Sequence, residues 1–171
     1  MRIIIVLAFT CLLCGCRNDK VDDGYLCRYM FFPTSSNENA FWVEVKKNKT
    51  MEVTLGDMTW KCYTSIKHGK FPDKGIAWEN IKEKDSIVMM PTDYEQLEDY
   101  ASEARKRKSV NKFAEGISYD GMGHVLFIKE KYYFFELYDY DDKSVDNLIK
   151  KLKEISPINI RGSYGGTLQA N

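Results

Sequence analysis

Alternation of apolar and polar residues predicts strands through the first half of the chain. Residues 25–32 are almost continuously apolar and aromatic, as in a strand that is buried on both sides. Residues 41–46 and 51–55 alternate strictly, and the polar residues 47–50 between them predict a hairpin with one dry face and one wet face. Trp60, Cys62, Thr64 and Ile66 continue the period-two pattern, so we expect a further strand over 60–66.

Helical spacing occurs twice further along the chain. Residues 92–95 read Thr-Asp-Tyr-Glu, the pattern of a capping box, and apolar residues follow at helical spacing, which predicts a helix to about residue 108. Cations in its last turn suit the negative end of the helix dipole. Residues 145–155 carry an apolar stripe opposite lysines, which predicts a second helix capped by Asp142 or Ser144.

The remaining strands predict the fold class. Residues 124–128 and 132–138 are apolar and aromatic on either side of a short polar turn, and they predict a second hairpin. The stretch 76–90 is ambiguous, with a short element expected around 76–78 and a strand at 86–90. Together these elements predict a single α+β domain, with an antiparallel sheet of hairpins and two main helices.

The segment before the first strand is of a different kind. Residues 3–13 form an apolar run after Arg2, too short for a membrane-spanning helix of about 20 residues and typical of a secretory signal peptide. The run closes on Leu13-Cys14-Gly15-Cys16, which resembles the lipobox of bacterial lipoproteins. This resemblance implies cleavage before Cys16 and fatty acyl chains, such as palmitate, on that cysteine. Two or more chains hold a protein firmly on a membrane.

The lipobox sets the expected organisation of the chain. Residues 1–15 are the signal peptide, 16–24 a lipidated polar tether, 25–161 the folded domain, and 162–171 a glycine-rich flexible tail. Acidic residues just after the cysteine resemble the surface-export tethers of some Gram-negative lipoproteins. We therefore expect a lipid-anchored protein of the cell envelope, with the outer membrane favoured and the side that it faces left open.

Charge narrows the range of partners. The chain holds 25 basic and 25 acidic residues, and removal of the signal peptide takes away Arg2, which leaves 24 against 25 and a formal charge of −1. A nucleic-acid partner is not expected, because such domains are usually strongly basic. The expected partners are the membrane, through the lipid on Cys16, and another envelope protein.

Two cysteines remain in the expected domain. Cys27 and Cys62 form an even pair in an oxidising compartment, which predicts a disulfide worth roughly 3–4 kcal/mol. The two residues would meet if the strands at 25–32 and 60–66 were neighbours. Two unpaired thiols are the alternative.

One stretch of the sequence suggests a catalytic site. Gly121-Met122-Gly123-His124 and the strand behind it resemble the Gly-His-Val hairpin of papain-like cell-wall amidases of the NlpC/P60 and CHAP type. The resemblance implies Cys62 as nucleophile, His124 as base and Glu136 as the residue that orients it, since a thiolate needs an adjacent imidazole. Glu136 shares a face with His124 if the hairpin loop is residues 129–131, and lies on the other face if the loop is Glu130 and Lys131.

Two features depart from that pattern. The family cysteine begins a helix, whereas 60–66 predicts a strand, and Cys27 is available to bridge Cys62. A zinc site would need every remaining cysteine and histidine at unusual spacings, and the acidic stretch 139–146 lacks the glycine of a calcium loop. We therefore expect no metal and no cofactor.

A binding role is the leading hypothesis from the sequence. Trp42 stands on the nominally wet face of the first hairpin, so Trp42, Glu44 and Tyr63 are the expected contact surface. We expect a membrane-anchored, non-enzymatic binding or inhibitory module of the envelope, of the kind that gives immunity to a toxin or hydrolase. The alternatives are a papain-like cysteine amidase or peptidase and a structural envelope protein.

Overall fold

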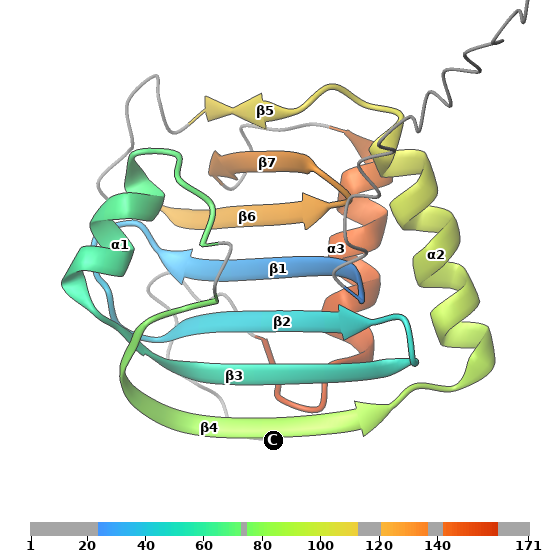
Figure 1. Ribbon diagram of the computed structural model, residues 1–171, viewed down its shortest axis with the longest axis horizontal. Helices are drawn as coiled ribbons and strands as arrows, with labels where there is room; N and C mark the ends of the chain where they lie inside the picture. Colours follow the sequence, from blue (N-terminus) through green and yellow to red (C-terminus); the bar gives the residue numbers. More distant parts are fainter. Residues whose placement is uncertain (1–23, 73–74, 113–120, 137–141, 161–171) are drawn as a thin grey trace, which may run out of the picture.

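A single α+β domain is formed by the residues that the computed structural model describes, 24–72, 75–112, 121–136 and 142–160 (Figure 1). Seven strands make one sheet in the order β4-β3-β2-β1-β6-β7-β5. Neighbouring strands are antiparallel except β5 and β7, which are parallel. The fold class predicted from the sequence is confirmed.

The elements follow one another as strands, helix, strand, helix, strands, helix. In chain order they are β1 (Tyr25–Pro33), β2 (Ala40–Lys46), β3 (Thr50–Met58), α1 (Trp60–Lys67), β4 (Trp78–Val88), α2 (Pro91–Arg105), β5 (Val110–Asn111), β6 (Met122–Ile128), β7 (Lys131–Glu136) and α3 (Lys143–Ile155).

Helices α2 and α3 cover one face of the sheet and make the larger core. In Figure 1, α3 passes behind the strands, with α2 beside it. Alternate strand residues point into this core, among them Tyr29, Val43 and Leu126, which solvent does not reach. The apolar stripe predicted on α3 is buried against them, with Leu148 and Leu152 at its centre. We call this side the helix-covered face.

The amino ends of α2 and α3 are capped in different ways. Asp142 caps α3, because its carboxylate accepts hydrogen bonds from the amides of Ser144 (2.9 Å) and Val145 (3.4 Å). The predicted capping box of α2 is wrong: Pro91 is the first helical residue and Met90 the N-cap, without a side-chain bond. Proline lacks an amide hydrogen and suits the first helical position, so the helix begins one residue before Thr92.

The carboxyl end of α2 is held by β7. The Tyr133 hydroxyl donates to the Ala104 carbonyl at 2.8 Å, and the Lys131 ammonium donates to the carbonyls of Arg105 and Arg107. A cation suits the negative end of a helix. These bonds fix α2 against the sheet and end it at Arg105, three residues before the predicted end.

Helix α1 lies on the opposite face, and it replaces the strand predicted over 60–66. Thr59 is its N-cap, and its hydroxyl accepts a hydrogen bond from the Cys62 amide at 3.3 Å. The segment buries Tyr63 and Ile66, which are three residues apart, as on a helix. Eight residues are short enough to fit both periods, so alternation alone misled the prediction.

Strand β4 is continuous from Trp78 to Val88, where the sequence predicted two separate elements. It pairs only with β3 among the described residues, and nearly all its side chains are exposed. An edge strand with so little burial lacks the apolar alternation that marks strands in a sequence. Gly56 of β3 allows close packing, since a Cβ there would lie 2.9 Å from the Trp78 ring.

Candidate binding surface on the open face of the sheet

The predicted membrane anchor lies outside the described residues. This holds for the signal peptide, for Cys16, for the tether as far as residue 23, and for the tail at 162–171. Among the helices that the structure does describe, none is long and apolar enough to cross a membrane.

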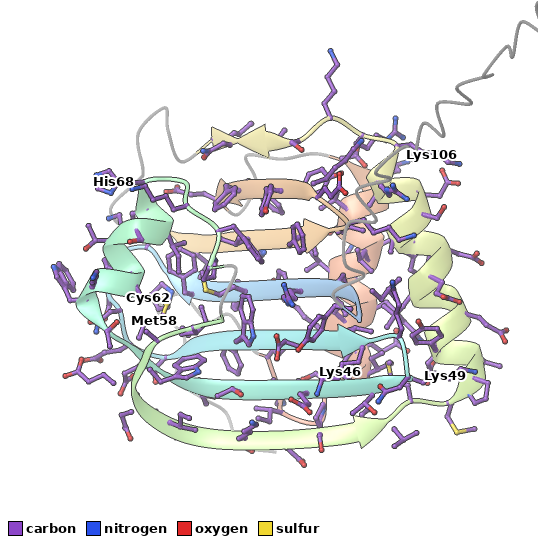
Figure 2. The ribbon with its side chains drawn as sticks, in the orientation of Figure 1. Lys46, Lys49, Met58, Cys62, His68 and Lys106 are labelled. Atoms are coloured by element: carbon purple, nitrogen blue, oxygen red, sulfur yellow. The ribbon has the colours of Figure 1, made fainter. Side chains whose placement is uncertain are left out.

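The two cysteines of the domain are free thiols on opposite sides of the sheet. Cys27 is fully buried on the helix-covered face, and burial raises its pKa to about 12. Cys62 is half-buried near the start of α1 and packs against the core on the other face (Figure 2). The expectation that they face each other across neighbouring strands is not met, because 60–66 is a helix and not a strand.

The structure does not bring together the three residues that the amidase resemblance implied. The β6–β7 turn consists of Lys129 and Glu130, so His124 lies opposite Phe135 and Glu136 opposite Gly123. His124 therefore points to the helix-covered face, whereas Glu136 points to the α1 face. Cys62 does begin a helix, as in that family, but the sheet separates it from His124.

His124 is held in place by a hydrogen bond and by ring packing within the core. Its Nδ1 is 2.9 Å from the Tyr29 hydroxyl, and its ring stacks on Phe135 with centroids 5.0 Å apart. Burial, together with the positive charge of Lys153, lowers the pKa of His124 to about 3. The ring is therefore neutral at physiological pH. The Cys62 thiol has a pKa raised by burial, the opposite of an activated nucleophile.

The predicted contact residues are mostly buried. Trp42 is only 5% exposed because Phe71, from the segment after α1, packs on it with ring centroids 5.9 Å apart. Tyr63 is also buried, and its hydroxyl donates to the Thr34 carbonyl. The prediction that Trp42 and Tyr63 are exposed contacts is wrong, whereas Glu44 does reach the surface of this sheet face.

Half-buried aromatic rings form a continuous band on the α1 face, and we name Tyr25, Arg28, Phe71, Phe127 and Tyr132 the aromatic band. Phe127 and Tyr132 are cross-strand partners on β6 and β7, with ring centroids 4.7 Å apart. Phe71 packs on both, at 4.8 and 5.0 Å. The Arg28 guanidinium lies 3.9 Å from the Tyr25 ring centre and 5.9 Å from that of Phe127. Every member is partly exposed.

An ion pair extends the aromatic band across the sheet. Arg28 of β1 and Glu44 of β2 are register partners, and Arg28 Nε lies 3.4 Å from a Glu44 carboxylate oxygen. Their side chains are 12% and 20% exposed, so solvent screens this pair only in part. The band thus combines flat apolar rings with a fixed pair of opposite charges.

Two cavities flank the segment that follows α1. One, of about 620 Å³, is lined by Phe71, Asn111, Tyr132 and Phe134, among others. The other, of about 370 Å³, lies beside β4 and is lined by Arg28, Glu44, Lys84 and two tryptophans, among others. The α1 face is therefore hollowed on both sides of Phe71.

The charged groups at the ends of the strands do not assemble a metal centre. Among the described residues, no three His, Cys, Asp or Glu side chains are placed to hold one ion. Part of the acidic stretch weighed as a calcium loop, residues 139–141, lies outside the described residues. The open face offers aromatic surface, hydrogen-bonding groups and paired charges.

The sequence held a partial signal of the aromatic band. The run at 132–135 showed rings on both sides of one strand, and three of the four prove to be buried core residues, which leaves Tyr132 partly exposed. Phe71 carried no signal, because it stands alone in a loop between glycines and a proline. Its position over the sheet depends on the fold of α1.

No protein-family model matches the chain, and no curated protein matches it.

Proposed function

We propose that this protein is a lipid-anchored binding module of the bacterial cell envelope, and that the aromatic band contacts a partner protein. The observation that carries this proposal is the row of half-buried rings around Arg28 on the face that α2 and α3 leave open. Aromatic residues and arginine are enriched at the centres of protein interfaces and supply most of their binding energy.

The anchor part of the proposal rests on the lipobox ending at Cys16. A nine-residue tether from Cys16 to Gly24 reaches at most about 30 Å when fully extended. Tyr25, the first residue of β1, belongs to the aromatic band, so the band begins where the chain enters the domain. A partner bound there would be another envelope protein close to the membrane, and an inhibitory, immunity-like role is one form of such binding.

Fractionation tests the anchor. Cys16→Ser removes the acyl acceptor, so the protein should move from the membrane fraction to the soluble fraction and lose label from fatty acid. Cys14→Ser is the matched control and should remain on the membrane. Membrane retention of Cys16→Ser would exclude the anchor while leaving the binding surface to be tested separately.

Affinity capture from detergent-solubilised envelope tests the surface. The double variant Phe127→Ser/Tyr132→Ser removes the centre of the aromatic band, and we expect it to lose a partner that the wild-type protein retains. Glu95→Gln on α2, exposed on the other side of the molecule, is the control and should keep that partner. Equal recovery with all three proteins would contradict the proposal.

A further inference from the structure

The cavity beside β4 has the size and lining of a small-molecule site. Its volume of about 370 Å³ falls at the lower end of the range typical of ligand pockets. Strands β1 to β4 form its floor, and the segment 75–78, which leads into β4, forms one wall. The lining is mostly polar, so it favours a ligand rich in hydrogen-bonding groups over an apolar one.

Among the described residues that line this cavity, three are charged, and together they carry a net positive charge. Arg28 and Glu44 lie 3.4 Å apart and offset each other. Lys84 stands opposite Thr54 on the neighbouring strand and has no ion-pair partner among the described residues. An anion is therefore the ligand charge that the cavity favours.

Flat rings and a hydroxyl complete the lining. Trp42 from the sheet and Trp78 from the far wall both line the cavity, and Thr54 adds a hydroxyl. Because the lining is mostly polar, these rings present little apolar surface to the cavity, and the Thr54 hydroxyl and the Glu44 carboxylate are the groups that suit the hydroxyl groups of a polyol. An inorganic anion would use the charge alone and leave these groups without contacts.

We propose that this cavity binds a small hydroxylated carboxylate, of the sugar-acid class. The carboxylate would lie at Lys84 and Arg28, which are suited to charge-assisted hydrogen bonds. The hydroxyl groups would donate to Glu44 and exchange hydrogen bonds with Thr54. This site does not depend on the Cys16 anchor or on a protein partner.

The test is an NMR titration of the mature chain carrying Cys16→Ser. D-glucuronate and D-glucose are matched probes that differ in the carboxylate. We expect D-glucuronate to shift the amide signals of Thr54, Trp78 and Lys84, and D-glucose to bind at least about fivefold more weakly. Inorganic phosphate should shift these signals less than D-glucuronate at equal concentration. No shift with D-glucuronate, or an equal response to phosphate or glucose, would overturn the proposal.

Two variants test whether the carboxylate of the ligand binds at Lys84. Lys84 is exposed, so Lys84→Gln should fold normally and weaken D-glucuronate binding by roughly fivefold. Lys108→Gln makes the same change of charge on an exposed residue that does not line the cavity, and it should leave binding unchanged. Unchanged affinity in Lys84→Gln would contradict the assignment. Arg28 belongs both to the aromatic band and to this cavity, whereas Phe127 and Tyr132 do not line the cavity, so the double variant used for partner capture tests the partner without altering the ligand site.

Discussion

The two faces of the sheet differ in what covers them, and the difference separates a closed core from the surface that we propose for recognition. On one face, α2 and α3 exclude solvent, and residues such as Tyr29 and Leu126 are fully buried. On the other, α1 and the segment after it cover only part of the strands, so Phe127 and Tyr132 remain half-exposed. Adjacent residues of one strand therefore lie in different environments.

The two faces also differ in the charge and exposure of their polar groups. The helix-covered face holds a neutral histidine with one hydrogen bond to Tyr29 and rings on either side. The open face keeps the charged pair Arg28 and Glu44 and an exposed lysine beside a cavity. A group that must stay uncharged packs the core, whereas groups that stay charged remain within reach of solvent or a ligand.

The largest expected loss of stability comes from a comparison of two neighbouring residues of β6. Leu126→Ala leaves a cavity under α2 and α3 and should lower the free energy of unfolding by about 2–5 kcal/mol. Phe127→Ala should cost only about 1 kcal/mol, because solvent already reaches that ring. Urea denaturation of both variants measures the difference. Equal losses would mean that the faces are covered alike.

The second prediction concerns pH. The pKa of His124 is about 3 in the folded protein and about 6.5 when unfolded, so only the unfolded chain takes up this proton between those values. Stability should therefore fall as the pH is lowered from 6.5 towards 3, by up to about 1.4 kcal/mol per pH unit from this residue. Lys153 adds to the effect, and Tyr29 is the other group that faces the ring.

His124→Gln isolates that contribution. Glutamine keeps a hydrogen-bonding group for Tyr29 but does not titrate, so the stability of the variant should depend less steeply on pH below 6.5 than that of the wild-type protein. Denaturation midpoints at pH 7 and pH 5 give the comparison. Identical pH dependence in the two proteins would rule out the neutral buried histidine.

A smaller loss of stability is expected when the N-cap at the start of α1 is removed. Thr59→Ala removes the N-cap bond to the Cys62 amide and should cost about 1 kcal/mol. Thr59→Ser keeps the hydroxyl and should be close to wild type. A loss in both variants would point to the methyl group of Thr59 rather than to the cap.

The smallest change in stability is expected at the rim of the cavity beside β4. Lys84→Gln should change the free energy of unfolding by no more than about 0.5 kcal/mol, because the side chain is exposed and forms no ion pair with the described residues. A change of more than 1 kcal/mol in a urea titration would give Lys84 a structural role and weaken its assignment to ligand binding.

Local pattern predicted much of the fold. The hairpin of β2 and β3 follows from strict alternation, and α3 follows from its apolar stripe and the cap at Asp142. In α3 one side is buried and the other is exposed, and in the hairpin the alternate residues of one face form the larger core, so the sequence carries the period directly. The other face of the hairpin is not uniformly wet, because Trp42 is buried there too. The exposed edge strand β4 has no such contrast, and its extent could not be predicted.

The candidate site depended on information that local pattern does not contain. Whether Glu136 shares a face with His124 is set by the two-residue turn at Lys129 and Glu130, and a shift of one residue would reverse the face of Glu136. The burial of Trp42 depends on Phe71, which is 29 positions away in the chain. Contacts of this kind follow from the position of α1 over the sheet.

Site-specific photo-crosslinking in intact cells tests most directly the claim that the open face is the binding surface. A photoreactive residue replaces either Tyr132, in the aromatic band, or Gln96, exposed on α2. We expect a specific adduct with an envelope protein from position 132, lost when Phe127→Ser is added, and none from position 96. An adduct from position 96 alone, or none from position 132, would contradict it.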